Sequence, residues 1–206
     1  MSLFAEVLRA LDAGRSAALA TVVAAGGSTP RHVGARMVVF ADGTAHDTIG
    51  GGRIELAVMQ AGQAVAAGAP ATRVRHHLVR DLAMCCGGWM DIVVAPAAPD
   101  RAVLAAAAAA IADRAPVTLT TALADGRLGL AAVEAADGAG PRVVDDVLRE
   151  RIGGVPRAIV FGAGHVGRAL TPLLAGLGFE VIVCDDDDTG ALAQPIAGAA
   201  RTVDSF

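Results

Sequence analysis

Residues 158–167 read AIVFGAGHVG, a short apolar run followed by three glycines in the spacing GxGxxG. A leucine-rich helical pattern follows at 170–177, and the apolar stretch 179–184 then ends at Asp185. Strand, glycine turn, helix and second strand come in the order that α/β domains use to bind dinucleotides. We therefore predict a Rossmann-like βαβ unit in this part of the chain.

Each glycine of this fingerprint has an expected task. Gly162 permits the tight turn, Gly164 lets a phosphate approach the backbone, and Gly167 lets the helix pack closely on the strand. Asp185 is placed to accept hydrogen bonds from ribose hydroxyls, and the acidic run that it begins favours a dinucleotide without a phosphate on its ribose. The alternative is a domain that keeps its glycines for packing alone and binds no nucleotide.

The sequence after Asp188 is short for a doubly wound sheet. It can form one more helix and a short strand at 201–203, so the Rossmann-like domain is expected to be incomplete. Either the chain is a fragment, or a partner subunit covers the bare face, which favours a homodimer. Glycines and a proline at 153–156 suggest a boundary, so we predict one domain at 1–150 and a second at 155–206.

The first domain is predicted to be mixed α/β. Its apolar periodicity and turn signals give the following expected elements. Helices are expected at 3–13 (with Ser2 as N-cap), 54–67 and 103–114; strands at 17–24, 37–40, 44–49, 72–79, 92–95, 117–123 and 128–133; and loops at 81–88 and 135–141. The fold class is therefore α/β, a mixed domain followed by an incomplete Rossmann-like unit.

Composition narrows the class of protein. The formal net charge is −4 with no basic block, so nucleic acid is not an expected partner. No apolar run is long enough to cross a bilayer, and the N-terminus does not resemble a signal peptide. Three cysteines, two of them adjacent, do not form a secreted disulfide framework. We expect a cytoplasmic protein with free thiols.

Two segments of the first domain are rich in anion-binding groups. Residues 27–37 place the hydroxyl of Ser28 and the guanidinium groups of Arg31 and Arg36 in and beside one loop. Gly50, Gly51 and Gly52 lie between a strand and a helix, where the backbone can close around a phosphate. The plainer interpretations are a solvated surface turn and an ordinary tight turn.

The third segment is the pair Cys85 and Cys86, followed by two glycines. Adjacent thiols in a glycine loop can bind a soft metal or carry a sulfur atom. They can also be inert, small apolar side chains. Nearby His76 and His77 are expected at the surface, and Trp89 in packing or as a pocket wall.

Together these segments resemble the XdhC/CoxI family, the accessory proteins of xanthine dehydrogenase and related molybdenum hydroxylases. The resemblance runs over 27–55, continues at the cysteine pair, and includes the fingerprint at 162–167. Met84 departs from it, because the family often has glutamine before the cysteines.

The resemblance implies a non-enzymatic chaperone for the molybdenum cofactor. Such a protein binds the cofactor, protects it while a cysteine desulfurase supplies sulfur, and passes it to an apo xanthine dehydrogenase-type enzyme. Here the phosphate would lie at Gly50–Gly52 with Arg31 or Arg36, and a thiolate of Cys85 or Cys86 would contact the metal. That thiolate needs a lowered pKa.

Two other functions compete with this one. The first is an NAD-dependent oxidoreductase that uses the fingerprint, although a complete second nucleotide half and a proton-transfer residue are not evident. The second is a non-catalytic dimerisation scaffold, with the Rossmann-like segment as its interface. A nucleotide at the fingerprint is also compatible with the chaperone.

Overall fold

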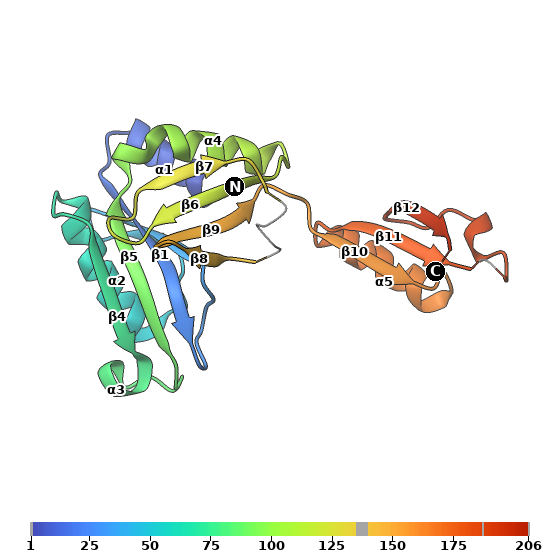
Figure 1. The fold of residues 1–206 in the computed structure, drawn as a ribbon, viewed down its shortest axis with the longest axis horizontal. Coiled ribbons are helices and arrows are strands. Elements are labelled where there is room, and N and C mark those ends of the chain that lie inside the picture. Colours follow the sequence, from blue (N-terminus) through green and yellow to red (C-terminus); the bar gives the residue numbers. More distant parts are fainter. Residues whose placement is uncertain (1, 135–139, 187, 206) are drawn as a thin grey trace. The chain divides into compact units, whose positions relative to one another are not determined.

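The chain divides after Gly153 into two compact units, 1–153 and 154–206 (Figure 1). The computed structural model describes residues 2–134, 140–186 and 188–205. Both units combine helices with sheets, so the α/β fold class is confirmed. None of the described helices is both long and apolar enough to cross a bilayer.

An antiparallel sheet of five strands forms the centre of the first unit, in the order β3-β2-β1-β5-β4. Its strands are β1 (Ala17–Gly26), β2 (Arg36–Phe40), β3 (Ala45–Asp47), β4 (Thr72–His77) and β5 (Trp89–Pro96). Helix α2 (Gly52–Ala66) packs across one face of this sheet. A β-carbon at Gly62 of α2 would lie 2.7 Å from the Val39 side chain, so this glycine permits the close approach.

The other face of the five-stranded sheet packs against two helices and a second sheet. The helices are α1 (Leu3–Asp12) and α4 (Arg101–Ala112), which follows the short 3₁₀ turn η1 (Ala98–Asp100). The second sheet has the order β7-β6-β9-β8 and contains β6 (Val117–Ala122), β7 (Leu128–Ala131), β8 (Arg142–Val144) and β9 (Val147–Ile152). Val23 and Val93 of the first sheet contact Leu123 and Leu148 in a shared buried cluster.

Most expected elements of this unit are present, with three differences. The strand predicted at 72–79 ends at His77, and residues Leu78–Leu82 form the short helix α3. The strand predicted at 44–49 is limited to Ala45–Asp47. Strands β8 and β9 were not predicted, because charged residues conceal the apolar alternation of β9. The predicted connection 135–141 lies mostly outside the described residues.

Three parallel strands form the second unit, in the order β10-β11-β12. They are β10 (Arg157–Phe161), β11 (Glu180–Asp185) and β12 (Ala199–Asp204), with helix α5 (His165–Gly176) between the first two. This order is that of one half of a doubly wound sheet. The helix expected after Asp188 is only the 3₁₀ turn η3 (Ala191–Ala193).

Pro172 lies inside α5, and the helix continues through it to Gly176. The hydroxyl of Thr171 donates a hydrogen bond of 2.7 Å to the carbonyl of Gly167, one turn earlier. A proline lacks the backbone donor that a helix interior uses. The helix therefore continues past a residue that cannot donate a backbone hydrogen bond.

Candidate functional site

Three loops of the first unit meet at one end of the five-stranded sheet. The loop after β1 contacts the turn before α2, where a β-carbon at Gly50 would lie 2.5 Å from the Pro30 ring. The turn contacts the loop before β5, where a β-carbon at Gly52 would lie 3.2 Å from the Met84 methyl. The structure therefore brings together the three segments that the sequence analysis selected.

The cysteine loop is held by backbone hydrogen bonds on both sides. The N–H of Gly88 donates to the Ser28 carbonyl at 2.9 Å, and the Gly88 carbonyl accepts from Leu78 N–H at 2.9 Å. A β-carbon at Gly88 would lie 2.5 Å from the Ser28 carbonyl oxygen, so this position requires glycine. Ser28 itself is exposed and contributes its carbonyl to this contact.

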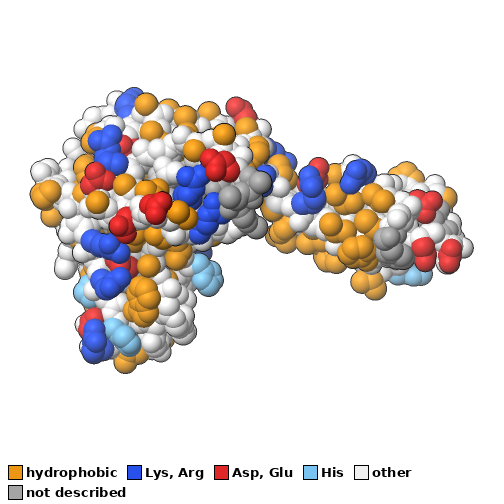
Figure 2. All heavy atoms as spheres, in the orientation of Figure 1, with side chains coloured by type: hydrophobic (Ala, Val, Ile, Leu, Met, Phe, Trp, Pro, Cys, Tyr) orange, Lys and Arg blue, Asp and Glu red, His pale blue; other side chains and the backbone are white. Residues whose placement is uncertain are grey.

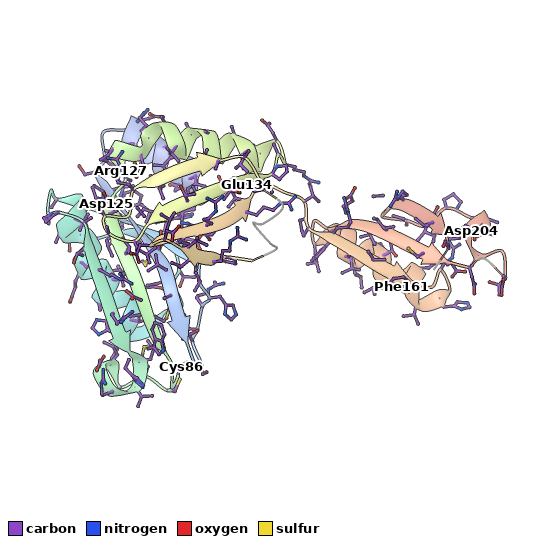
Figure 3. All side chains as sticks on the ribbon, in the orientation of Figure 1. Cys86, Asp125, Arg127, Glu134, Phe161 and Asp204 are labelled. Atoms are coloured by element: carbon purple, nitrogen blue, oxygen red, sulfur yellow. The ribbon has the colours of Figure 1, made fainter. Side chains whose placement is uncertain are left out.

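The two thiols differ in their surroundings. Cys85 is exposed, whereas Cys86 is half-buried and packs against the core beneath α2. Figure 3 shows Cys86 at the tip of the sheet. A hydrogen bond with Cys85 and burial raise the pKa of the Cys86 thiol. The lowered pKa that a preformed thiolate needs is therefore not found at Cys86.

The cysteine pair is the metal-binding candidate of this loop. Within the described ranges, no three histidine, cysteine or acidic side chains are grouped so that they could hold a metal ion. Two neighbouring sulfurs would leave most of a metal's coordination to other ligands.

A carboxylate of the protein occupies the turn before α2. All three glycines have positive φ, at 126° for Gly50, 72° for Gly51 and 68° for Gly52. The N–H of Gly51 donates to Glu55 at 2.9 Å, and the Thr48 hydroxyl donates to the same oxygen at 2.5 Å. A phosphate at this turn would have to displace Glu55, which argues against the predicted role of Gly50–Gly52.

Arg36 is committed to a buried ion pair. Its side chain is 7% exposed and pairs through both terminal nitrogens with Glu150 of β9, which is 8% exposed. It also donates to Thr121 at 3.3 Å and to the Gly34 carbonyl at 3.0 Å. The prediction that Arg36 binds phosphate is therefore corrected, since its charge joins the two sheets. Arg31 is exposed.

A pocket of about 370 Å³ opens beside the cysteine loop. It is lined by Arg75, His77, Arg80, Asp81 and Trp89. Sequence reasoning missed this site, because His77 was assigned to the surface and Trp89 to packing or a pocket wall. The available signal was the alternation of Arg73, Arg75 and His77 along β4, which places all three on one face.

In the second unit, the fingerprint glycines have separate tasks. Gly162 has a φ of 101°, and a β-carbon at Gly167 would lie 1.9 Å from the Gly162 carbonyl oxygen. Gly164 has an ordinary φ of −71°, and a β-carbon there would meet no atom within 4 Å. Neither packing nor backbone conformation requires glycine at 164, so this position leaves room for a ligand.

Asp185, at the end of β11, contacts the glycine turn. It is nearly buried, and its carboxylate accepts a 2.5 Å hydrogen bond from the N–H of Ala163 inside the glycine turn. Asp185 therefore helps to hold the turn together, and its contact with a ribose stays a prediction. A mostly apolar pocket of about 650 Å³ lies beside the turn, along β10 and α5.

The sequence was compared with models of known protein families, and one family matches. Residues 10–77 match the model of the XdhC and CoxI family. The resemblance to the XdhC/CoxI family is confirmed. The matched XdhC/CoxI segment includes Ser28 and Gly50–Gly52, and it ends at His77, before the cysteine pair.

A solved structure resembles the whole chain in its fold. It is described as a xanthine dehydrogenase from Bacillus halodurans, shares 20% sequence identity, and superposes with a TM-score of 0.59. The alignment covers 100% of this chain and 69% of that one. At this identity the likeness concerns the fold. No curated protein matches the sequence.

Proposed function

We propose that this chain is an accessory protein of a xanthine dehydrogenase-type molybdenum hydroxylase and carries the molybdenum cofactor as its cargo. The observation that carries the proposal is the pair Cys85 and Cys86, held where three glycine-rich loops meet. The XdhC/CoxI segment and the xanthine dehydrogenase description of the similar structure support this accessory role.

The pair suits temporary binding. Cys85 is open to solvent while Cys86 is anchored against the core, so one sulfur can reach a ligand from a fixed backbone. Gly87 leaves open space beside the thiols, since a β-carbon there would meet no atom within 4 Å. Two sulfurs bind a soft metal without enclosing it, which permits release to a client enzyme.

The proposal includes partners and location. The client is an apo xanthine dehydrogenase-type enzyme, and a cysteine desulfurase supplies sulfur while the cofactor is held. The cytoplasm keeps the thiols reduced and available for this task. We further propose a homodimer and a protein that catalyses no reaction itself.

Cofactor retention tests the proposal. The purified chain is incubated with molybdenum cofactor, separated by gel filtration, and assayed for molybdenum and pterin in the protein peak. Cys184, a half-buried cysteine of the second unit, provides the matched control. Retention by the wild type and Cys184→Ser, with loss in the Cys85→Ser/Cys86→Ser variant, supports the proposal. Equal retention in all three would contradict it.

One observation favours a second candidate function, nucleotide binding at the fingerprint. Gly164 is a glycine that the chain itself does not require, at the place where a phosphate would approach. Titration with NADH, followed by its own fluorescence, tests this candidate against Gly164→Val. Binding that the variant abolishes would support an NAD-dependent activity, and absence of binding to the wild type would exclude it.

A further inference from the structure

The pocket beside the cysteine loop is built from both ends of one chain segment. Residues 78–88 leave the sheet after β4 and return to it at β5, and the thiols lie within this excursion. His77 stands where it leaves, Trp89 where it returns, and Arg80 lies within α3. The β-sheet register pairs His77 with Trp89 directly. The pocket and the cysteine pair therefore share one structural support.

Positive charge is fixed along one side of this pocket. Asp91 has a fully buried side chain and accepts hydrogen bonds of 2.6–2.9 Å from both Arg73 and Arg75. One carboxylate thus holds two guanidinium groups, whose outer surfaces remain exposed. Burial raises the pKa of Asp91, but the hydrogen bonds from the two arginines outweigh it and lower the pKa overall. The cluster therefore keeps an excess positive charge at neutral pH.

The acidic residue of the pocket lining is already paired. Asp81 accepts a hydrogen bond of 2.7 Å from Arg80 and another of 2.7 Å from the His77 N–H. These contacts lower the pKa of Asp81 to about 2. With Asp81 and Asp91 both engaged, the three arginines exceed the carboxylates by one, and His77 adds a further donor. Figure 2 shows basic, histidine and hydrophobic side chains gathered around this end of the unit.

Trp89 supplies a rigid apolar wall. Its indole lies against the backbone of Gly26, where a β-carbon would be 2.5 Å from the ring nitrogen. The side chain is nevertheless 37% exposed, and the Arg75 guanidinium stands 5.3 Å from the ring centroid. An indole beside an arginine offers flat surfaces against which a planar heterocycle can pack. A volume of about 370 Å³ is within the range of small-ligand sites.

We propose that this pocket binds a phosphorylated planar heterocycle, with Arg75, His77 and Arg80 contacting the phosphate and Trp89 packing against the ring. Guanidinium groups match phosphate oxygens in geometry and charge. The turn before α2 lacks this advantage because Glu55 occupies it. The identification of the ligand as the pterin part of the cofactor rests on the proposed function, whereas the pocket itself does not.

The composition of the chain provides a direct probe. Trp89 is the only tryptophan and the chain contains no tyrosine, so intrinsic indole fluorescence reports on this pocket alone. The full chain is titrated with a phosphorylated pterin, the same pterin without phosphate, and inorganic phosphate. We expect the phosphorylated pterin to quench Trp89 and to bind at least tenfold more tightly than the unphosphorylated compound.

Substitutions of the pocket arginines test whether their positive charges determine binding. Arg75→Gln/Arg80→Gln leaves Arg73 to hold Asp91, and we expect it to weaken binding of the phosphorylated pterin at least tenfold. Arg9→Gln, which removes a surface arginine of α1, serves as the matched control and should bind like the wild type. No quenching by any probe, equal binding with and without phosphate, or unchanged binding by the double variant would overturn the proposal.

The two proposals fail separately. If Cys85→Ser/Cys86→Ser loses molybdenum but Arg75→Gln/Arg80→Gln binds the phosphorylated pterin like the wild type, the carrier stands and the pocket assignment is wrong. If the pocket binds phosphorylated pterin as expected but the cysteine variant retains molybdenum fully, the pocket stands and the cysteine-based carrier is wrong.

Discussion

Arg36 and Glu150 connect the two sheets of the first unit through a buried charge pair. Position 36 lies on β2 and position 150 on β9, and a β-carbon at Gly34 would lie 2.1 Å from the Glu150 carboxylate. Position 34 is therefore constrained to glycine by the ion pair, because any side chain there would collide with the Glu150 carboxylate. Breaking such a pair leaves one buried charge without a partner, which costs far more than losing a surface pair.

Glu150→Gln tests this pair. We expect it to lower the free energy of unfolding by about 3 kcal/mol, because it keeps the side-chain volume but leaves the Arg36 charge uncompensated. Urea denaturation followed by Trp89 fluorescence measures the change. Glu6→Gln, which breaks a more exposed pair with Arg9, is the control and should cost less than about 1 kcal/mol. Equal effects would refute the buried pair's structural role.

The ion pairs of Asp91 imply that the stability of the fold depends on pH. Its pKa is lowered in the folded chain by Arg73 and Arg75, so its contribution to stability is present above the ordinary pKa of about 3.9. That contribution is lost as the pH falls from there toward the lowered pKa. Urea midpoints measured between neutral pH and about pH 3 should fall more steeply for the wild type than for Asp91→Asn. Parallel curves would contradict the prediction.

At the scale of elements, α2 begins with a capping carboxylate. Glu55 accepts from the Gly51 N–H and from the Thr48 hydroxyl, which joins the glycine turn to the first turn of the helix. Helix N-termini favour negative charge because their first N–H groups lack partners. The protein satisfies this preference with its own side chain.

Glu55→Ala distinguishes the two possible phosphate sites, the Gly50–Gly52 turn and the pocket of Trp89. We expect it to destabilise the fold by about 1 kcal/mol through loss of the cap, and to leave the affinity for phosphorylated pterin unchanged. Fluorescence titration and urea denaturation of the same variant provide both values. Tighter binding by Glu55→Ala would instead place the phosphate at Gly50–Gly52.

Local patterns account for what the sequence predicted at this scale. The fingerprint at 162–167 is recognisable because its residues are close together in the chain. Helix α3 was missed because its five residues follow an alternating strand, and His77 caps it through a hydrogen bond from the Arg80 N–H. The first residue of α3, Leu78, also donates its backbone N–H to the carbonyl of Gly88, where the chain returns to the sheet.

The candidate site was predictable only in part, because many of its contacts join residues that are far apart in the sequence. Its loops could be selected from their glycines and cysteines, but the hydrogen-bond partner of each polar group could not be predicted. Glu150 and Arg36 are separated by 114 positions, and no local pattern indicates that they pair. The predicted role of Arg36 failed because Glu150, its partner, is brought near only by the fold.

At the scale of the whole molecule, the candidate sites are divided between the two units. The cysteine loop and the pocket of Trp89 lie in residues 1–153, whereas the fingerprint lies in residues 154–206. Each unit has its own buried cluster, with Val160, Val181 and Val183 in the centre of the second. Damage confined to one unit should therefore leave the other site in place.

Gly167→Ala tests this separation. Its methyl group would overlap the Gly162 carbonyl, so we expect the second unit to lose about 1–3 kcal/mol of stability. Far-UV circular dichroism should show part of the chain unfolding earlier, while the transition followed by Trp89 stays where it is. Gly176→Ala, where a β-carbon would meet no atom within 4 Å, is the matched control. A shifted Trp89 transition would contradict independent units.

The central claim is that Cys85 and Cys86 hold the cargo. The most direct measurement is the molybdenum content per chain after gel filtration, for the wild type, Cys85→Ser and Cys184→Ser loaded side by side. Because Cys85 is exposed, its substitution should leave the fold intact, and each variant's circular dichroism spectrum verifies this. We expect full retention by the wild type and Cys184→Ser, and a loss of about tenfold or more in affinity for Cys85→Ser, equivalent to about 1.4 kcal/mol. Retention by Cys85→Ser equal to that of Cys184→Ser would contradict it.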